Sequence, residues 1–325
     1  MKIAAFFSGS GGLDLGFELA GHKVIWANEY DKTIWKTYES NHQSTILDRR
    51  SIIDINSEDV PDCEGIIGGP PCQSWSEAGA LRGINDHRGQ LFFDFIRMIR
   101  SKRPLFFLAE NVSGMLASRN SEALNQIKQL FIDSGYKLSF KLLNASDYGV
   151  PQDRERVFFV GFRTDLNKTF EFPQAFESKL SLRDSIFDLK DNALAASGAK
   201  TIGNLCEVPN HEYLSGSFST MFMSRNRVRS WDEQSFTIQA GGRHCPIHPQ
   251  APKMIRLGKD EHIFKPGEEH LYRRLTVREA ARVQTYPDSF IFHYENVLDG
   301  YKMVGNSVPV KLAKVLAESI ILQLK

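Results

Sequence analysis

The stretch MKIAAFFSGSGGLDLGFELAGHKVIWAN, residues 1–28, decides the fold class of this 325-residue chain. Residues 3–7 form a short apolar run that predicts a buried strand, and residues 24–28 form a second one. Between them lie a glycine-rich turn and residues 13–20, whose apolar side chains have helical spacing. A strand, a turn, a helix and a second strand are typical of an α/β domain with a parallel sheet.

The same alternation continues to about residue 162. The pattern predicts further strands at residues 65–68, 105–110, 136–144 and 156–162, and further helices at 31–41, 90–101 and 122–134. These elements indicate an open parallel sheet covered by helices on both faces. From about residue 175 the composition changes, and residues 181–270 are rich in Gly, Pro, Ser, Asn and His. They indicate a second, irregular or β-rich domain, before helical patterns return at 276–284 and 309–324.

The bulk composition excludes several classes of protein. No apolar run is long enough to cross a bilayer, and the N-terminal apolar run is too short for a signal peptide, so we expect a cytoplasmic protein. The four cysteines are widely spaced, which favours free thiols over a disulfide framework. The net charge is only +1, so any nucleic-acid site must concentrate its positive charge in one region.

The turn FFSGSGG, residues 6–12, is the first candidate site. Glycines allow a ligand to approach the backbone closely, and the following helix begins with free N–H groups. Glu29 follows the second strand, where a carboxylate can accept hydrogen bonds from ribose hydroxyls. Together they favour an adenosine-containing cofactor over a turn that serves packing alone. They do not separate a dinucleotide from S-adenosylmethionine.

The segment GGPPCQSWSEAG, residues 68–79, is the second candidate site. Its two prolines stiffen the chain and keep it out of helix and sheet, which places Cys72 at the carboxyl edge of the sheet. A free cysteine is most often a small buried apolar residue. The glycines, prolines and polar neighbours favour a nucleophile in a site loop instead.

Charged residues at two other strand ends complete the set. Glu110, in AENV (residues 109–112), closes an apolar run and is a candidate proton donor, although a rim charge or a helix cap would look the same. Arg154 and Arg156, in PQDRERVFFVGF (residues 151–162), share a face if that segment is extended. They would hold a phosphate or a base carbonyl, or else form salt bridges.

The ordered motifs resemble those of the cytosine-C5 DNA methyltransferases. The series is FFSGSGG (6–12), GGPPCQ (68–73), AENV (109–112), QDRER (152–156), YRRLTVREAARVQTYPDSF (272–290) and VGNSVPV (304–310). The resemblance implies a Rossmann-like catalytic domain that binds S-adenosylmethionine and a smaller target-recognition domain. We therefore expect a catalytic domain at 1–178, a target-recognition domain at 179–272, and a C-terminal segment, 273–325, that returns to the catalytic domain.

The resemblance also implies a role for each site residue. Cys72 would attack carbon 6 of a flipped-out cytosine, Glu110 would protonate N3, Arg156 would contact the base carbonyl, and Arg154 would help to order the same site. Arg88 would lie in a loop, residues 73–90, that closes over DNA. The implied cofactor contacts are Phe7, Gly9, Ser10, Gly12, Glu29, Pro71, Leu91, Asn306 and Ser307.

One position departs from the family pattern. The family usually carries an acidic residue, which contacts the adenine amino group, where this chain has Ser51. Asp54 or Asp48 would substitute after a local shift. Otherwise the adenine is held less specifically.

Residues 217–256 contain six basic and two acidic residues, a net charge of +4. This concentration favours double-stranded DNA as the partner, with Arg225, Arg227, Arg229 and Arg243 as candidate contacts. The segments NHEYLSGS (210–217), FMSRNRVRSW (222–231) and CPIHPQAP (245–252) resemble those of GGCC-specific members, which implies methylation of the inner cytosine. The nearby Cys206, His211, His244, Cys245 and His248 form an awkward set for one zinc ion, so we expect no metal.

Three other functions are weaker interpretations. A binding protein without activity would not need the four catalytic candidates, and a nicotinamide-dependent oxidoreductase leaves PPC and ENV unexplained. A tRNA cytosine methyltransferase shares the catalytic motifs, but Gln73-Ser74 and the arginine-rich region favour DNA. We expect a monomer whose functional partner is a restriction endonuclease acting on the same site.

Overall fold

The computed structural model describes residues 1–71 and 87–325, without the side chains of residues 87–89. The chain divides into two compact units. Unit 1 consists of residues 1–144, 155–175 and 312–325, and unit 2 consists of residues 145–154 and 176–311. The two elements nearest the C-terminal end of unit 2, α6 (Val277–Val283) and α7 (Val297–Asn306), precede the return of the chain to unit 1 in α8 (Val310–Leu324). The expected C-terminal segment, 273–325, is therefore shared between the two units.

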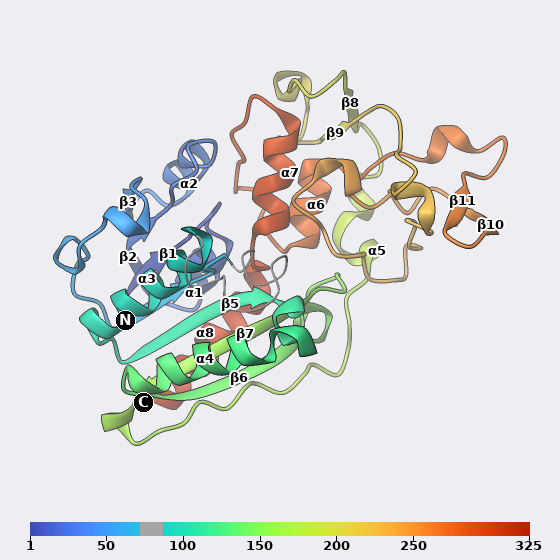
Figure 1. The fold of residues 1–325 in the computed structure, drawn as a ribbon. Coiled ribbons are helices and arrows are strands. Elements are labelled where there is room, and N and C mark those ends of the chain that lie inside the picture. The colour runs from blue at the N-terminus through green and yellow to red at the C-terminus, as the bar shows by residue number, and fades with distance from the viewer. Residues whose placement is uncertain (72–86) are drawn as a thin grey trace. The chain divides into compact units, whose positions relative to one another are not determined.

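The described residues of unit 1 form one seven-stranded sheet with the strand order β3-β2-β1-β4-β5-β7-β6 (Figure 1). The strands are β1 (Lys2–Phe6), β2 (Lys23–Asn28), β3 (Ile46–Asp48), β4 (Gly65–Gly68), β5 (Phe106–Val112), β6 (Tyr136–Asn144) and β7 (Glu155–Arg163). The expectation of a fully parallel sheet is wrong at one strand, because β7 runs antiparallel to both β5 and β6. The connection between β6 and β7, residues 145–154, is shorter than the dozen or more residues that a parallel crossover requires.

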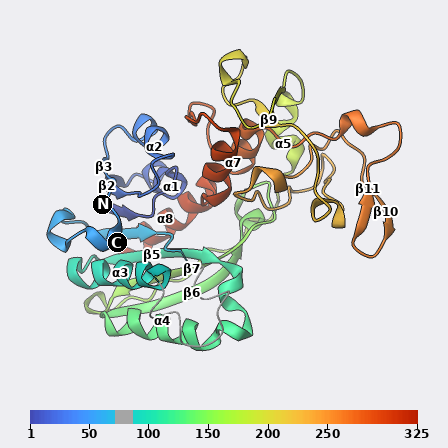
Figure 2. The same cartoon turned by 45° about the horizontal axis from the view of Figure 1, so that its top comes forward.

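The strand order reverses direction between β1 and β4. The chain moves from β1 to β2 and β3 on one side, and from β4 to β5 on the other. Since crossovers are right-handed, the two sets of connecting helices cover opposite faces of the sheet. They are α1 (Gly12–Leu19) and α2 (Trp35–Asn41) for the first set, and α3 (His87–Lys102) and α4 (Ser121–Asp133) for the second (Figure 2). Ligands of open α/β sheets bind at the carboxyl ends of strands where the order reverses, here β1 and β4.

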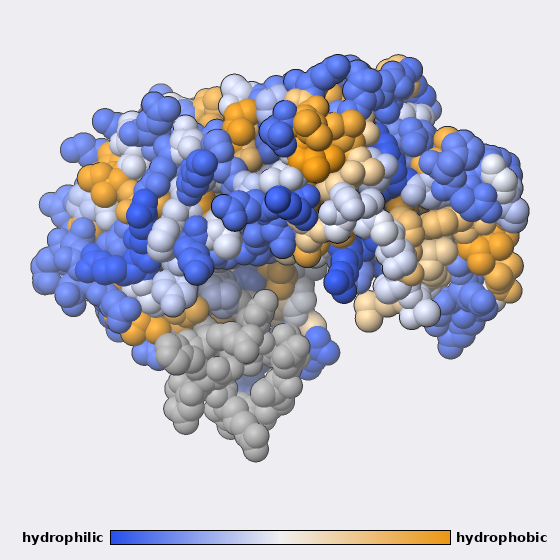
Figure 3. Space-filling model, turned by 90° about the horizontal axis from the view of Figure 1, so that it is seen from above, coloured by the Kyte–Doolittle hydropathy of each residue, from blue (hydrophilic) through white to orange (hydrophobic). Residues whose placement is uncertain are grey.

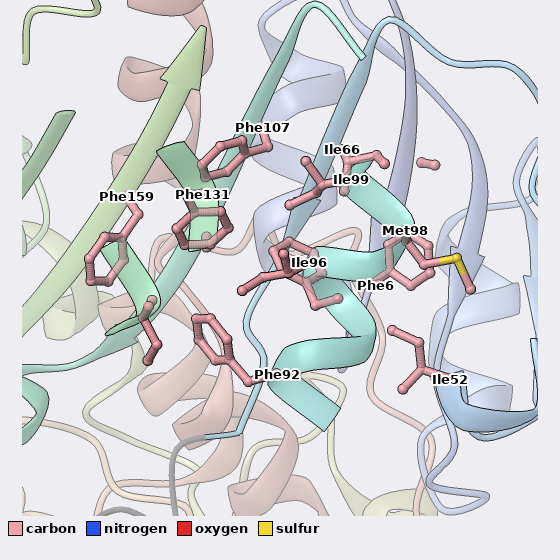
Figure 4. Packing of buried hydrophobic residues seen from close by; sticks show 14 of the residues in the cluster. Phe6, Ile52, Ile66, Phe92, Ile96, Met98, Ile99, Phe107, Phe131 and Phe159 are labelled. Carbon is pink, nitrogen blue, oxygen red and sulfur yellow. The ribbon is translucent and has the colours of Figure 1, made fainter. Parts of the chain in front are cut away.

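Aromatic side chains fill the space between the sheet and α3 and α4 (Figure 4). The rings of Phe107, on β5, and Phe131, on α4, are stacked with centroids 4.3 Å apart. Phe95, on α3, meets the edge of Phe6, on β1, at 6.0 Å. These four side chains have no exposed surface. The strand ends that carry the candidate site are therefore held by a close-packed core.

Unit 2 is irregular and contains little strand. Besides α6 and α7 its described elements are α5 (Leu182–Ile186), β8 (Leu194–Ala196), β9 (Glu212–Leu214), β10 (Ile255–Gly258) and β11 (Glu261–Ile263). The strands form two separate pairs, β8 with β9 and β10 with β11. A small apolar cluster around Phe222, Val228 and Ile247 packs in the same unit.

A buried polar cluster supports the interior of unit 2. The fully buried carboxylate of Glu279 accepts two hydrogen bonds from the Arg273 guanidinium, both at 2.7 Å, and one from the Thr276 N–H at 2.8 Å. His248 is also fully buried, with Nε2 3.4 Å from Glu279 Oε1 and the edge of Trp231 against its ring. Burial lowers the pKa of His248 to about 4. This histidine is therefore neutral in the folded protein near neutral pH.

The face of the molecule seen in Figure 3 is predominantly hydrophilic. On the face seen in Figure 3, hydrophobic residues form separate patches between hydrophilic ones. Across the described residues, every helix is too short or too polar to span a membrane.

Candidate active site

The glycine-rich loop after β1 has an unusual backbone. Phe7, Gly9 and Gly11 all have positive φ angles, of 54°, 54° and 88°. Glycine adopts this conformation freely, whereas it strains a phenylalanine. The loop closes on itself through a hydrogen bond of 2.9 Å from the Gly11 N–H to the Ser8 carbonyl. The sequence FFSGSGG is therefore explained by a sharp turn that begins helix α1 at the carboxyl end of β1.

Glu29, the expected ribose contact, holds two loops together. Its carboxylate accepts hydrogen bonds from the N–H of Gly9 at 2.8 Å and from that of Asp31 at 2.7 Å. It thus joins the loop after β1 to the loop after β2. Its neighbour in the sequence, Tyr30, is 73% exposed. We did not predict Tyr30 from the sequence, although a large aromatic residue directly after an acidic strand end was an available signal.

Several expected cofactor contacts surround the same strand ends in unit 1. Phe7 packs against Phe95 of α3 with ring centroids 6.4 Å apart, and Leu91 of α3 packs against the same apolar cluster. Ser10 is buried in the loop, and Pro71 is half-buried after β4. Gly12 is the first residue of α1.

The remaining two expected contacts, Asn306 and Ser307, lie in unit 2 at the end of α7. Asn306 is exposed. The Ser307 hydroxyl is buried and hydrogen-bonded to the Tyr286 hydroxyl at 2.5 Å.

The three candidates for the adenine contact have different surroundings. Ser51 caps a short 3-10 helix, Ile52–Asp54, by accepting a hydrogen bond from the Ile53 N–H at 3.4 Å. Asp48 is bound by the Arg50 guanidinium at 2.6 to 3.2 Å, and these hydrogen bonds lower the pKa of its carboxyl. Asp54 is exposed. Of the two carboxylates, Asp48 is thus committed to an arginine and Asp54 is open to solvent.

Glu110 and Arg156 form an ion pair at the edge of the sheet. Arg156, in the second position of β7, places Nε 2.9 Å from Oε1 of Glu110 near the end of β5, and both side chains are largely buried. The next residue, Asn111, donates a hydrogen bond of 2.9 Å to the Pro70 carbonyl. A Cβ atom added to Gly69 would lie only 3.1 Å from Glu110 Oε2. The Gly-Pro-Pro segment is therefore fixed beside the carboxylate of Glu110.

Two other expected site residues fall outside what the structure describes. Cys72 directly follows Pro71 in the sequence and lies outside the described residues. Arg88 belongs to the first turn of α3, but its side chain is likewise not described.

Arg154 has a different environment from Arg156. It is 1% exposed, and its guanidinium donates hydrogen bonds to the carbonyls of Ile238, Gly305 and Ser307 at 2.8 to 2.9 Å. Arg154 therefore binds backbone groups of unit 2.

Gln152 reinforces the same contacts. Its side chain accepts a hydrogen bond of 2.8 Å from the Ile238 N–H and donates one of 2.9 Å to Gln284. Gln152 and Arg154 together attach the residues around Ile238 to the end of α7.

The four candidate DNA contacts, Arg225, Arg227, Arg229 and Arg243, have different environments in unit 2. Arg225 and Arg243 are exposed. Arg227 is buried, with hydrogen bonds to the carbonyls of Phe222 and Met221 at 3.0 and 3.2 Å. Arg225 directly follows a 3-10 turn at Phe222–Ser224, and Arg227 folds back onto the carbonyls of that turn and of Met221 before it.

Arg229 is the fourth candidate, and it forms ion pairs with Asp153 at 3.1 Å and with Glu233 at 3.4 Å. Its guanidinium also stacks over the Phe236 ring, 4.3 Å from the centroid. Arg229 is thus engaged within unit 2.

A polar cavity of about 190 Å³ adjoins Arg225 in unit 2. Its lining includes Arg225, Arg227, Gln239, His244 and Asp153. Hydrogen-bond donors and hydrogen-bond acceptors thus line the same cavity. Charge counting missed Gln239 and His244, because a neutral amide and a single imidazole carry no such signal.

The expected absence of a metal concerned Cys206, His211, His244, Cys245 and His248. His211 is hydrogen-bonded to the Thr276 hydroxyl and the Asp191 carbonyl, at 3.0 and 3.1 Å. Within residues 1–71 and 87–325, no group of three or more His, Cys, Asp or Glu side chains is arranged to hold a metal ion.

Comparisons with known proteins agree with this arrangement. The family model for C-5 cytosine-specific DNA methylases matches residues 1–322. The type II methyltransferase M.FnuDI of Fusobacterium nucleatum is 59% identical over 98% of this chain and 94% of its own length. The type II methyltransferase M.NgoPII of Neisseria gonorrhoeae is 56% identical over 98% of this chain and 95% of its own length.

Solved structures show the same fold at lower identity. The Entamoeba histolytica methyltransferase EhMeth has a TM-score of 0.71 and 18% identity, covering 100% of this chain and 99% of its own. The DNMT2 protein of Spodoptera frugiperda has a TM-score of 0.70 and 19% identity, covering 98% of this chain and 99% of its own. The sheet of unit 1 is thus the Rossmann-like sheet of these methyltransferases. With a family model matched from residue 1 to residue 322 and relatives more than half identical, the chain belongs to the C-5 cytosine-specific DNA methylases and is a DNA methyltransferase.

Proposed function

We propose that this enzyme transfers a methyl group from S-adenosylmethionine to carbon 5 of a flipped-out cytosine, through a covalent bond to Cys72. The observation that carries the proposal is the Glu110–Arg156 pair beside the Gly-Pro-Pro segment that leads to Cys72. The acid Glu110 and the cation Arg156 are in contact, and the candidate nucleophile Cys72 follows the Gly-Pro-Pro segment in the sequence. This is the set that activation of a cytosine requires.

The loop after β1 fits an adenosine-containing cofactor. Gly9 has no atom within 4 Å of an added Cβ, so its backbone is open to a ligand. Glu29 supplies acceptor oxygens and Tyr30 an exposed ring. The cofactor would be held by the unit 1 residues Phe7, Gly9, Ser10, Gly12, Glu29, Pro71 and Leu91, with Asn306 and Ser307 as the proposed contacts from unit 2. When bound, S-adenosylmethionine supplies an electrophilic methyl group.

Cys72 and Glu110 activate the base. The Cys72 thiolate forms a bond to carbon 6, and the electrons of the C5–C6 double bond shift so that carbon 5 becomes nucleophilic. Glu110 delivers a proton to N3, which neutralises the charge that the ring acquires. Arg156 compensates the carboxylate left on Glu110 and donates to the base carbonyl. After methylation, water takes the C5 proton, breakage of the S–C6 bond restores the C5–C6 double bond and the thiolate, and the N3 proton returns to the Glu110 carboxylate.

The target is a short duplex site, which we propose to be GGCC with methylation of the inner cytosine. The chemistry requires the base to leave the stack. Arg225 and Arg243 are exposed and are the proposed guanine contacts, because a guanidinium pairs with O6 and N7 of guanine. The partners of Arg227 and Arg229 within unit 2 assign these two residues to shaping the site instead.

The biological setting follows from the relatives' names. Type II methyltransferases act in restriction–modification, so the functional partner is a nuclease that cuts the same site. We further propose that the enzyme acts as a monomer in the cytoplasm.

Trapping tests the covalent step. A GGCC duplex with 5-fluorocytosine at the inner position, incubated with S-adenosylmethionine, should give an adduct that survives denaturation, because fluorine cannot leave as a proton does. Cys72→Ser should give none while retaining its circular dichroism spectrum. The matched control is the same duplex with one guanine of the site replaced. An adduct in Cys72→Ser would place the nucleophile elsewhere.

Bisulfite sequencing of plasmid modified by the enzyme tests the sequence of the site separately. Protection confined to the inner cytosine of GGCC supports the assignment. Cytosines protected from bisulfite conversion at another motif would refute GGCC as the site, while still supporting the proposed methylation of cytosine.

A further inference from the structure

Three side chains on one side of helix α2 and its C-terminal cap contact the loop after β1 or the segments beside it. Trp35, Tyr38 and His42 are spaced three and four residues apart, so they lie along one side of the helix and its C-terminal cap. Each has a contact in the segments that form the proposed cofactor site. None of these three residues is among the proposed catalytic, cofactor-binding or DNA-binding residues.

Trp35 holds the acidic residue of the site. Its indole Nε1 donates a hydrogen bond of 2.8 Å to the backbone carbonyl of Glu29. The side chain of Glu29 in turn accepts from the Gly9 N–H. Trp35 therefore fixes the backbone of the residue that ties down the loop.

Tyr38 holds the first turn of α1. Its hydroxyl donates a hydrogen bond of 2.6 Å to Oδ2 of Asp14, and both side chains are buried. The Ser8 hydroxyl, in the loop after β1, also interacts with the Asp14 carboxyl and acts to lower its pKa, against the rise that burial causes. Tyr38 thus holds a buried carboxyl group that interacts with the loop.

His42 supports the turn at Gly11. A Cβ atom added to Gly11 would lie 2.1 Å from Nε2 of His42, so the imidazole is in direct contact with the glycine backbone. The ring is fixed by Glu18, 3.1 Å from Nδ1, and by stacking on Tyr38 with centroids 4.4 Å apart. The glycine at position 11 is required by this contact as well as by its positive φ angle.

We propose that Trp35, Tyr38 and His42 are positioning residues that set the affinity for S-adenosylmethionine without touching it. Through Glu29, Asp14 and Gly11 they hold the loop in its strained, binding-competent turn. A loop that must be ordered by its ligand binds that ligand more weakly, because part of the binding free energy is used to order it. This inference rests on the proposed function, which places the cofactor on this loop.

Tyr38→Phe is the sharpest test, because it removes one hydroxyl and keeps the ring that stacks on His42. We expect calorimetry to show binding of S-adenosylhomocysteine weakened about tenfold, a ratio that corresponds to about 1.4 kcal/mol. The KM for S-adenosylmethionine should rise by a similar factor, with the affinity for DNA unchanged. Trp35→Phe, which removes the donor to Glu29, should also weaken binding.

Tyr136→Phe is the matched control. Tyr136 is also buried in unit 1 and donates a hydrogen bond of 2.8 Å to the Pro104 carbonyl, away from the loop. It should lower stability by a similar amount and leave cofactor binding unchanged. Equal weakening in this control, or parental binding in both Tyr38→Phe and Trp35→Phe, would overturn the inference. Absence of binding in the parent protein would instead refute the proposed cofactor.

Discussion

His248 makes unit 2 sensitive to acid in a way that one substitution should remove. Its pKa falls from 6.5 to about 4 on burial. Between these values the unfolded chain binds a proton that the folded protein does not, so folding stability falls as the pH falls. Above pH 6.5 both states are neutral and the effect vanishes. Below pH 4 both states are protonated and no further stability is lost from this residue.

The size of the effect follows from the two pKa values. One pKa unit is worth about 1.4 kcal/mol, so going from pH 7 to pH 4.5 should remove about 2 to 3 kcal/mol from the free energy of unfolding. His248→Gln retains a polar side chain of similar length but does not titrate. Over the same pH interval, the free energy of unfolding of the variant should therefore fall by about 2 to 3 kcal/mol less than that of the parent.

Hydrogen exchange measured by mass spectrometry can assign this loss to unit 2. The His248 N–H is bonded to the Arg273 carbonyl at 2.8 Å, and the Leu275 N–H to the Pro246 carbonyl at 3.0 Å, so peptides that contain these amides report on the cluster. Rates must be corrected for intrinsic exchange at each pH. Peptides from β1, in unit 1, serve as the internal reference. Equal loss of protection at 248 and 275 in parent and variant would refute this account of the cluster.

Four other substitutions test separate residues. Burial raises the pKa of Asp14 from 3.8 to about 6, so the stability that this residue contributes is lost as the pH rises through this range. The effect of Asp14→Asn on the free energy of unfolding, measured in urea, should therefore be more favourable at pH 7 than at pH 4 by up to about 3 kcal/mol. Glu110→Gln should lower the rate of methyl transfer by about 10²- to 10⁴-fold, with cofactor binding retained in calorimetry. Arg225→Ala should relax discrimination at one base position, at a cost of about 1 to 3 kcal/mol in DNA titrations, whereas Arg227→Ala should lower the melting temperature, because Arg227 is bonded within unit 2. An unchanged melting temperature in Arg227→Ala would contradict its structural role, and unchanged base discrimination in Arg225→Ala would contradict its role as a guanine contact.

The sequence predicted the parts of the fold that depend on local pattern. Strands β1 and β2 and helix α1 lie within a residue or two of their expected bounds, because apolar periodicity and glycine are short-range signals. The direction of β7 is a long-range property, determined by the length of the connection from β6 and by pairing with β5. Periodicity within a segment carries no information about either.

Helix α7 shows why another element was missed. It contains Gly300 and Gly305, which disfavour helix when considered locally. The structure requires both: a Cβ at Gly300 would lie 2.6 Å from the Tyr294 ring, and one at Gly305 would lie 2.3 Å from the backbone of Gln239. Glycine serves close approach at both positions, and at Gly305 the neighbouring backbone comes from a segment distant in the sequence.

The candidate site divides in the same way. Glu110, Arg156 and Glu29 could be named as candidates because each lies near one end of a strand, and strand ends are visible in the sequence. The different environments of Arg225 and Arg227 were not visible. They depend on a 3-10 turn and on carbonyl acceptors that any residue could supply. Side-chain partners can be inferred from composition, whereas backbone partners cannot.

The backbone contacts of Arg154 bear on how such enzymes could exchange target specificity. Segment 145–154 belongs to unit 2, although it lies between two strands of unit 1 in the sequence. A chimera joined at residues 176 and 311 would therefore separate Gln152 and Arg154 from the unit they support. The acceptors described above for Arg154 are the carbonyls of Ile238, Gly305 and Ser307, and every residue type has a carbonyl. A grafted unit 2 thus needs the correct backbone path at these three points, whereas the side chains at these points can differ.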